Sequence, residues 1–216
     1  MLESVIAKDG ARLIWSQEDG VGFLEVQNAG VYDDEYFRRY RAMSQTPMAI
    51  ALNGFRAKLV RRWSEGLSDS ITLLDVGIGD GAFLRTLEGA RGVQRFGADV
   101  NPAGIAYLEE HGQLGSLEET YDVVTFWDSL EHIRDPRWAL RAAAKVAIVS
   151  IPIFSGVEHV LASRHYRPDE HYWYFTRAGF CAFADREGFD VVDVLATETA
   201  LGRDGIETFV LNRRPA

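Results

Sequence analysis

From Ile71 onward, the chain alternates between short runs of apolar residues and segments with helical spacing. The apolar runs predict strands at Ile71–Val76, Arg95–Val100, Tyr121–Trp127 and Lys145–Ile151. Strands that are nearly continuous in apolar residues are typical of parallel sheets that are covered on both faces. The alternation therefore predicts an open, mostly parallel α/β sheet with helices on both faces.

The first 30 residues follow a different pattern, in which short apolar stretches are separated by Asp9-Gly10 and Asp19-Gly20. This predicts short strands joined by tight turns. Thr46-Pro47 then supplies an N-cap and a proline in the first helical position, and apolar spacing predicts a helix to about Trp63. We therefore expect an N-terminal strand and helix extension in residues 1–45, followed by the main domain in residues 46–216.

The last 40 residues predict a helix and two strands. Thr176 is a suitable N-cap for a helix that stops at Gly188. Strands are predicted at Val191–Ala196 and Glu207–Asn212, joined by a loop with two glycines. A connection of this length suits an antiparallel pair that closes the sheet.

Charge and composition exclude several classes of protein. The net charge is −9, which disfavours nucleic acid as a partner, because basic residues concentrate only between Arg38 and Arg62. The longest apolar stretch, Val146–Phe154, is far shorter than the roughly 18 residues of a membrane span, so no membrane association is expected. Cys181 is the single cysteine, no signal peptide is apparent, and we expect a cytoplasmic protein.

A glycine-rich loop follows the first predicted strand of the sheet, and it contains Asp75, Gly77, Gly79 and Gly81. In doubly wound folds, the crevice beyond such a strand end binds nucleotide-like ligands, and glycines let the backbone approach the ligand closely. The loop fits both a dinucleotide pattern and an acid-first pattern. Asp80 inside the loop disfavours a pyrophosphate, whereas S-adenosylmethionine has a sulfonium, an ammonium and no phosphate.

Asp99 ends the second strand of the predicted sheet, 18 residues after Gly81. An acid at this position can accept hydrogen bonds from both hydroxyls of an adenosine ribose. The carboxylate disfavours NADP, whose 2′-phosphate it would meet, but it does not exclude NAD. A turn-capping aspartate before Asn101-Pro102 is the structural alternative.

The segment Tyr121–Pro136, with its Leu130-Glu131-His132 motif, resembles the class I S-adenosylmethionine-dependent methyltransferases, in particular compact small-molecule members. With the glycine loop, Asp99 and the two terminal strands, the resemblance covers residues from about 71 to 212. It implies a Rossmann-like, seven-stranded sheet with an antiparallel last strand. The cofactor would bind across the ends of the first, second and fourth strands.

The resemblance also implies which residues bind S-adenosylmethionine. They are Asp75, Gly77, Gly79 and Gly81 for the methionine part, Asp99 for the ribose, Val100 and Asn101 for the adenine edge, and Trp127 and Asp128 near the sulfonium. One departure is the short gap before Tyr121, which must hold a helix and the third strand. We therefore expect His111–Leu117 to be little more than a stub of that strand.

Methyl transfer to oxygen or nitrogen can require one general base, and a histidine with a pKa near neutrality suits that role. His132, His159, His165 and His171 all follow the fourth and fifth strands, where the substrate should bind. His132 is the first candidate base by its place in the motif, and His171 is the second. The last three histidines are six residues apart, which matches no known metal-ligand spacing, so the sequence predicts no metal site.

Several alternatives remain open at individual residues. His132 could instead pack against its loop or cap a helix, and Asp128 could be the N-cap of the segment Ser129–Ile133. The aromatic run Tyr172–Tyr174 could form a pocket over the methyl group or belong to the core.

The sequence therefore predicts a methyltransferase that acts on a small polar acceptor molecule. Its N-terminal extension would cover the substrate entrance or form a contact in a homodimer. An NAD-linked oxidoreductase of Rossmann type and a non-catalytic S-adenosylmethionine-binding module are the alternatives. A nucleic-acid methyltransferase would need a basic face, for which the arginines between Arg38 and Arg62 are the only support.

Overall fold

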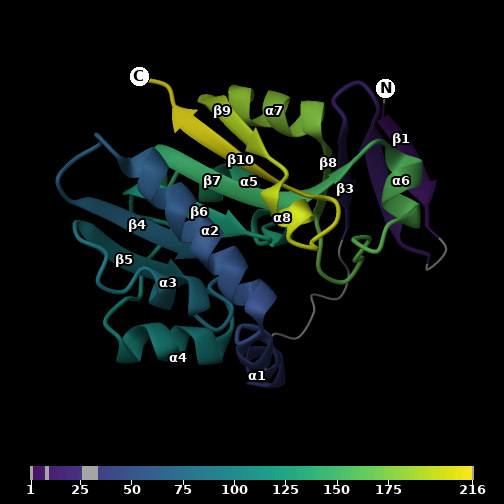
Figure 1. Cartoon of the computed structure of the whole chain (residues 1–216). Helices are drawn as coiled ribbons and strands as arrows, with labels where there is room; N and C mark the ends of the chain where they lie inside the picture. Colours follow the sequence, from purple (N-terminus) through teal and green to yellow (C-terminus); the bar gives the residue numbers. More distant parts are fainter. Residues whose placement is uncertain (1, 8–9, 26–33, 216) are drawn as a thin grey trace.

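Four parallel strands form the centre of the molecule, as the alternating pattern predicts (Figure 1). The computed structural model describes residues 2–7, 10–25 and 34–215. The central strands are paired in the order β5–β4–β6–β7. Their bounds are β4 at Ile71–Val76, β5 at Val93–Ala98, β6 at Tyr121–Trp127 and β7 at Ala143–Phe154.

The two C-terminal strands, β9 (Phe189–Leu195) and β10 (Ile206–Arg213), extend this sheet beyond β7. β10 is antiparallel to both β7 and β9, so the predicted antiparallel strand is confirmed. At the opposite edge, Gly97 of β5 forms an isolated parallel bridge with Leu114. This bridge is what remains of the third strand, within the segment that was predicted to be a stub.

Helices cover both faces of the sheet. Because successive side chains on a strand point to opposite faces, neighbouring residues of one strand contact different helices. The helices are α1 (Asp34–Met43), α2 (Pro47–Ser64), α3 (Ala82–Thr86), α4 (Pro102–Glu110), the 3₁₀ turn η1 (Leu130–His132), α5 (Pro136–Leu140), α6 (Val157–Ala162), α7 (Arg177–Arg186) and α8 (Thr197–Ala200). Leu73 packs with α2, α3 and α4 on one face of the sheet, and Leu74 packs with α5 and α7 on the other.

The predicted helix caps are present. The Thr46 side chain accepts a hydrogen bond from the Ala49 backbone at the start of α2, and Thr176 accepts one from Gly179 at the start of α7. Each cap satisfies a backbone N–H that would otherwise have no partner in the first helical turn. None of the described helices has both the length and the apolar character that crossing a bilayer requires.

The N-terminal strands are joined to the central sheet rather than standing apart from it. They are β1 (Leu2–Ile6), β2 (Arg12–Ser16) and β3 (Val21–Leu24), and β3 pairs with β8 (Trp173–Thr176), which in turn pairs with the end of β7. Figure 1 shows these strands on the side of the molecule that also carries α6. Residues 26–33 of the predicted extension lie outside the described residues.

The strand β8 was not predicted, because its aromatic residues were considered as a substrate pocket or as core. Tyr174 and Phe175 are fully buried, and Tyr174 belongs to a cluster that includes Trp15 of β2 and Phe154 of β7. The run Tyr172–Tyr174 is therefore mainly a structural connection between the extension and the sheet.

Candidate active site

The glycine loop begins where β4 ends, and its conformation requires glycine. Gly77, Gly79 and Gly81 have φ angles of 78°, 58° and 75°, in the left-handed region that disfavours side chains. There is also no room for a Cβ atom at two of these positions. A Cβ on Gly77 would lie 2.7 Å from the Cβ of Ser129, and one on Gly81 would lie 2.6 Å from the Tyr107 ring. The loop is therefore a cradle of bare backbone.

Asp75 lies at the end of β4 and is almost completely buried, with 1% of its surface exposed. The Thr125 hydroxyl on the neighbouring strand β6 donates a hydrogen bond of 2.7 Å to the Asp75 carboxylate. Burial raises the pKa of Asp75 to about 7, and the bond from Thr125 opposes that shift. The structure thus places this predicted cofactor ligand beneath the loop, with one contact already made to the sheet.

Asp80 does not contribute free negative charge to the loop, contrary to the argument from the sequence. Its carboxylate pairs with the Arg85 guanidinium at 2.6 Å and accepts a hydrogen bond of 2.8 Å from the Ser44 hydroxyl. The argument against a pyrophosphate is weaker at this residue, because the neighbouring arginine offsets the charge. The acidic character of the crevice depends instead on Asp75 and Asp99.

Asp99 lies directly across from the glycine loop. Gly77 donates a backbone hydrogen bond of 2.8 Å to Ala98, which brings the loop to the end of β5. The Asp99 carboxylate accepts a hydrogen bond of 2.8 Å from the Asn101 backbone, and the backbones of Ile78 and Gly79 also stabilise its charge. Burial nevertheless raises the pKa of Asp99. The predicted ribose-binding residue and the loop are therefore neighbours at the carboxyl ends of β4 and β5, where the sequence predicts the cofactor crevice.

The two predicted adenine contacts behave differently from each other. The Val100 side chain is 76% exposed, at the rim beside Asp99. Asn101 is buried, and its side-chain oxygen accepts a hydrogen bond of 2.9 Å from the Ala103 backbone as the N-cap of α4. Val100 thus presents an apolar side chain at the rim, whereas the Asn101 side chain is engaged in holding α4.

Trp127 is the last residue of β6, and Asp128 follows it directly. The Trp127 ring packs edge-on against Phe83, and the guanidinium of Arg56 lies 4.7 Å from the centre of the Trp127 ring. Asp128 has a positive φ of 53°, which is rare for a residue with a side chain and marks a tight turn at this edge of the sheet. The N-cap residue of η1 is Ser129, and no side chain caps this turn. The alternative role of Asp128 as a helix cap is therefore wrong.

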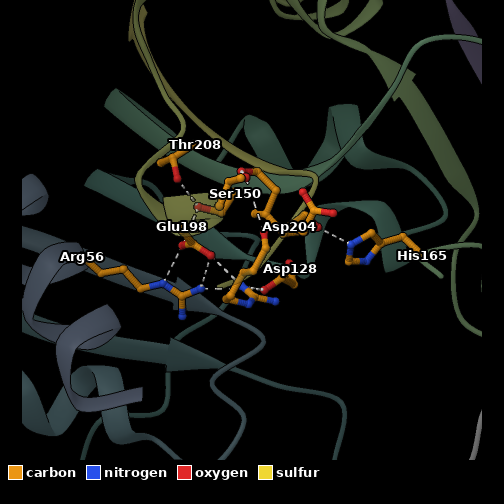
Figure 2. A network of polar contacts seen from close by, with 10 residues as sticks. Arg56, Asp128, Ser150, His165, Glu198, Asp204 and Thr208 are labelled. Carbon is orange, nitrogen blue, oxygen red and sulfur yellow. Dashed lines mark hydrogen bonds and ion pairs between the residues drawn. The ribbon is translucent and has the colours of Figure 1, made fainter. Parts of the chain in front are cut away.

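The Asp128 carboxylate belongs to a buried ionic network that the sequence did not predict (Figure 2). It pairs with Arg203 at 2.5 Å and lies 3.7 Å from Arg56. Both arginines also bind Glu198, which has no exposed surface and accepts a further hydrogen bond from Ser150. Burial alone would raise the pKa of Glu198, but the two guanidinium groups hold it below its ordinary value. No spacing rule relates these residues, which come from four separate elements.

Two of the four substrate-side histidines come together, and they are the two candidate bases. The His132 and His171 rings are 4.6 Å apart in an edge-on arrangement. Burial lowers the pKa of both rings, which favours neutral imidazole near pH 7. His159 instead binds the Ser155 backbone in a separate turn, and His165 binds the carbonyl of Asp204.

Glu131 completes this group and was not predicted as a site residue. The ligand-forming atoms of Glu131, His132 and His171 all lie within 4.8 Å of one another. We call these three residues the EHH cluster. Glu131 belongs to the Leu130-Glu131-His132 motif that the sequence analysis identified. The sequence did not predict that Glu131 is buried next to His171, which lies far away along the chain.

The EHH cluster adjoins the crevice along the same edge of the sheet. Ser129, two residues before Glu131, is the residue that closely approaches Gly77. The Tyr172 backbone donates a hydrogen bond of 2.9 Å to the Glu131 carbonyl and so fixes the segment before β8 against η1. The carboxyl ends of β4, β5 and β6 thus bring together a glycine cradle, an acid and a polar cluster, as expected for a ligand site in an α/β fold.

Comparison with known proteins places this arrangement in a family. The family model described as "Methyltransferase domain" matches residues 48–194, and no match was found among curated protein sequences. Magnesium protoporphyrin IX methyltransferase from Synechocystis PCC 6803, solved with bound S-adenosylmethionine, is 15% identical with a TM-score of 0.60. The match covers 85% of this chain and 93% of that one.

Two further solved structures have the same fold. A SAM-dependent methyltransferase from Archaeoglobus fulgidus is 13% identical with a TM-score of 0.58. The match covers 82% of this chain and 100% of that one. A chain from a Haloferax volcanii complex with the Trm112 methyltransferase activator is 14% identical with a TM-score of 0.60, and the coverage is 85% and 96%. These findings do not favour an NAD-linked oxidoreductase or a module without activity. The chain belongs to the methyltransferase domain family and is a class I, S-adenosylmethionine-dependent methyltransferase.

Proposed function

We propose that the enzyme transfers a methyl group to an oxygen or nitrogen atom of a small molecule. The observation that carries this proposal is the position of the EHH cluster, beside the glycine cradle and at the end of β6. When it is bound, S-adenosylmethionine supplies an electrophilic methyl group on a positively charged sulfur. An acceptor at the EHH cluster would lie on the side of the crevice away from Asp99.

The chain's own residues suit this cofactor. Gly77, Gly79 and Gly81 have positive φ angles, and their Cβ positions face Ser129, Tyr40 and Tyr107. Glycine therefore allows the loop its tight path at the end of β4, where we propose that its backbone contacts the methionine part. Asp99 offers a carboxylate for the two ribose hydroxyls. Asp75 adds negative charge that favours a ligand with an ammonium group once its carboxyl is ionised.

The candidate bases act on the acceptor. An oxygen or nitrogen acceptor must lose a proton during or after methyl transfer, and a neutral imidazole can accept it. Burial keeps His132 and His171 neutral, so each has a ring nitrogen able to serve as acceptor. Holding the acceptor atom about 3 Å from the methyl carbon and excluding water provides the remaining rate enhancement.

The charge of the chain supports a small acceptor over a nucleic acid. A net charge of −9 repels a polyanion, and the ionic network beside the crevice pairs its arginines internally with Glu198 and Asp128. For residues 1–45, a cover for the substrate entrance and a contact in a homodimer stay alternative predictions.

The experiment that tests the proposal is transfer of labelled methyl from S-adenosylmethionine to pools of small hydroxyl and amino compounds, with RNA and protein as separate acceptors. We expect label in a small-molecule pool and a loss of at least about 100-fold in rate for His132→Asn or His171→Asn. The matched control is His159→Asn, which lies outside the EHH cluster and should keep the rate. Label in RNA or protein alone would contradict the proposal.

A further inference from the structure

Three side chains that form the EHH cluster converge from two parts of the chain. Glu131 and His132 lie on η1, and His171 precedes β8. Backbone hydrogen bonds fix both parts: His132 donates to Ser129 at 3.1 Å, and His171 donates to Arg167 at 2.8 Å. The convergence is therefore held by the backbone on both sides.

The Glu131 carboxylate is buried without compensation from the protein. It is 1% exposed, and neither of its oxygens has a hydrogen-bond partner among the described residues. A buried polar group without a partner is rare and costly, and it marks a place where a ligand or ion is expected. Asp128, Glu198 and Arg203 all influence the ionisation of Glu131, but the two acids are already balanced by Arg203 and Arg56. The network therefore supplies no spare positive charge to the Glu131 carboxylate, and a bound cation would supply it.

The two imidazoles are oriented in the manner of metal ligands. The His132 ring is hydrogen-bonded to the Glu170 backbone, and the His171 ring to the His165 backbone. A backbone bond to one ring nitrogen fixes the ring and its tautomer, which is the usual arrangement of a histidine that binds a metal ion through its second nitrogen. One nitrogen of each ring and one oxygen of the Glu131 carboxylate all lie within 4.8 Å of one another.

We propose that Glu131, His132 and His171 bind one divalent transition-metal cation, of the Zn²⁺, Mn²⁺ or Co²⁺ class. Two imidazoles and one carboxylate form a donor set that these ions accept while keeping positions open for other ligands. Mg²⁺ and Ca²⁺ are less suited, because they prefer ligand sets made of oxygen. Metal–ligand bonds of about 2.1 Å place ligand atoms within about 4.2 Å of each other, so side-chain shifts of less than about 1 Å close the site.

The catalytic role of the cation rests on the proposed function. A cation in the EHH cluster would bind the acceptor's oxygen or nitrogen at an open position and lower its pKa. With a cation bound, His132 and His171 would serve as its ligands, and the proton of the acceptor would pass to solvent water instead of to an imidazole. Asp128 would stay outside the ligand set, because Arg203 already holds its carboxylate at 2.5 Å.

The test is a titration of the full chain, stripped of metal with a chelator, with CoCl₂. We expect visible absorption bands of protein-bound Co²⁺ that saturate at one equivalent and that excess Zn²⁺ abolishes. His132→Asn, His171→Asn and Glu131→Gln should each weaken Co²⁺ binding by at least about tenfold. His159→Asn is the matched control and should leave the titration unchanged. Saturation that is the same in all four variants would overturn the proposal.

A second measurement uses the unaltered chain, in case the variants fold poorly. X-ray absorption of the Zn²⁺-loaded protein should show two imidazole ligands, and Zn²⁺ should raise the melting temperature. Absence of imidazole scattering, or absence of binding at millimolar Zn²⁺, would overturn the metal site. Calorimetric binding of S-adenosylhomocysteine separates the two claims. Co²⁺ binding without S-adenosylhomocysteine binding would refute the proposed function alone, and the reverse would refute the metal site alone.

Discussion

At the scale of single residues, Asp99 is the most informative position in the crevice. Its carboxylate is oriented by backbone N–H groups from the glycine loop and from the start of α4, so it is prepared to accept hydrogen bonds from a ribose. We predict that Asp99→Ala weakens S-adenosylhomocysteine binding by about 1.5–3 kcal/mol, through the loss of charge-assisted hydrogen bonds. Calorimetry measures this change directly. Asp69→Ala, an exposed aspartate, is the control, and equal affinities for the two variants would contradict the assignment.

Asp75 should make the stability of the ligand-free protein depend on pH. Its pKa is about 7 when folded and near the ordinary 3.8 when unfolded, because burial disfavours the charged form. Its favourable contribution is complete below about pH 4 and is lost as the pH rises through 7. Asp75→Asn lacks this titration but can still accept the hydrogen bond from Thr125. The variant should therefore gain stability relative to the unaltered protein between pH 4 and pH 8, by up to about 4 kcal/mol.

Urea unfolding at several pH values measures this difference in the free energy of unfolding. Asp69→Asn, at an exposed position, should show no such trend. If the stability difference between Asp75→Asn and the unaltered chain stays constant from pH 4 to pH 8, Asp75 is not the buried, protonated group described above.

Individual residues of the site could be predicted from the sequence only where a local pattern carries them. The glycine loop, Asp99 and His132 stand beside strand ends, and short-range rules locate them. The sequence did not predict Glu198 and Arg203 as site residues. Their ionic network forms only because Arg56, more than 140 positions away from Glu198 along the chain, lies next to them in the fold. The argument that Asp80 disfavours a pyrophosphate was weakened, because the Asp80 carboxylate pairs with Arg85 and the sequence does not show the direction of either side chain.

At the scale of elements, the buried ionic network joins α2, the end of β6 and α8. Removing the charge of Glu198 would leave Asp128 as the one acid shared by Arg56 and Arg203, and the Arg56 side chain is only 10% exposed. We predict that Glu198→Gln costs about 3–5 kcal/mol of unfolding free energy, measured with urea. The control is Glu207→Gln, because its partner Arg177 is largely exposed and such pairs contribute at most about 1 kcal/mol. Equal costs for both substitutions would show that burial does not determine the strength of the network.

The N-terminal strands are a second element-scale feature, because they share a core with β7 and β8. Trp15 is fully buried in that core, between the extension and the main sheet. We predict that Trp15→Ala costs about 3–5 kcal/mol in thermal or urea unfolding. Trp138 is 39% exposed, and Trp138→Ala should change the stability by no more than about 0.5 kcal/mol. A small effect at Trp15 would mean that the extension is not integral to the fold.

Elements were predicted best where their pattern is long and local. The bounds of β4 and β6 agree with the predicted strands, since both are buried on two faces and read as continuous apolar runs. β8 was missed, because four aromatic and polar residues form a strand here only by pairing with β3 and β7. Strand pairing between distant segments leaves no periodic signal in a short sequence window.

At the scale of the whole molecule, one edge of the sheet collects the functional groups. The fold brings the glycine cradle, Asp99 and the EHH cluster to the carboxyl ends of β4, β5 and β6. The ionic network includes Asp128, which directly follows β6 (Figure 2). The chain belongs to a methyltransferase family, and we propose that the EHH cluster marks the place of the acceptor. The claim on which the rest depends is that this edge binds the cofactor.

A crystal structure of the full chain with S-adenosylhomocysteine tests that claim most directly. We predict that the ribose hydroxyls lie within hydrogen-bond distance of the Asp99 carboxylate, that the amino-acid part follows the backbone of Gly77–Gly81, and that the sulfur faces the EHH cluster. Electron density for the ligand elsewhere, or with its ribose turned away from Asp99, would contradict the account.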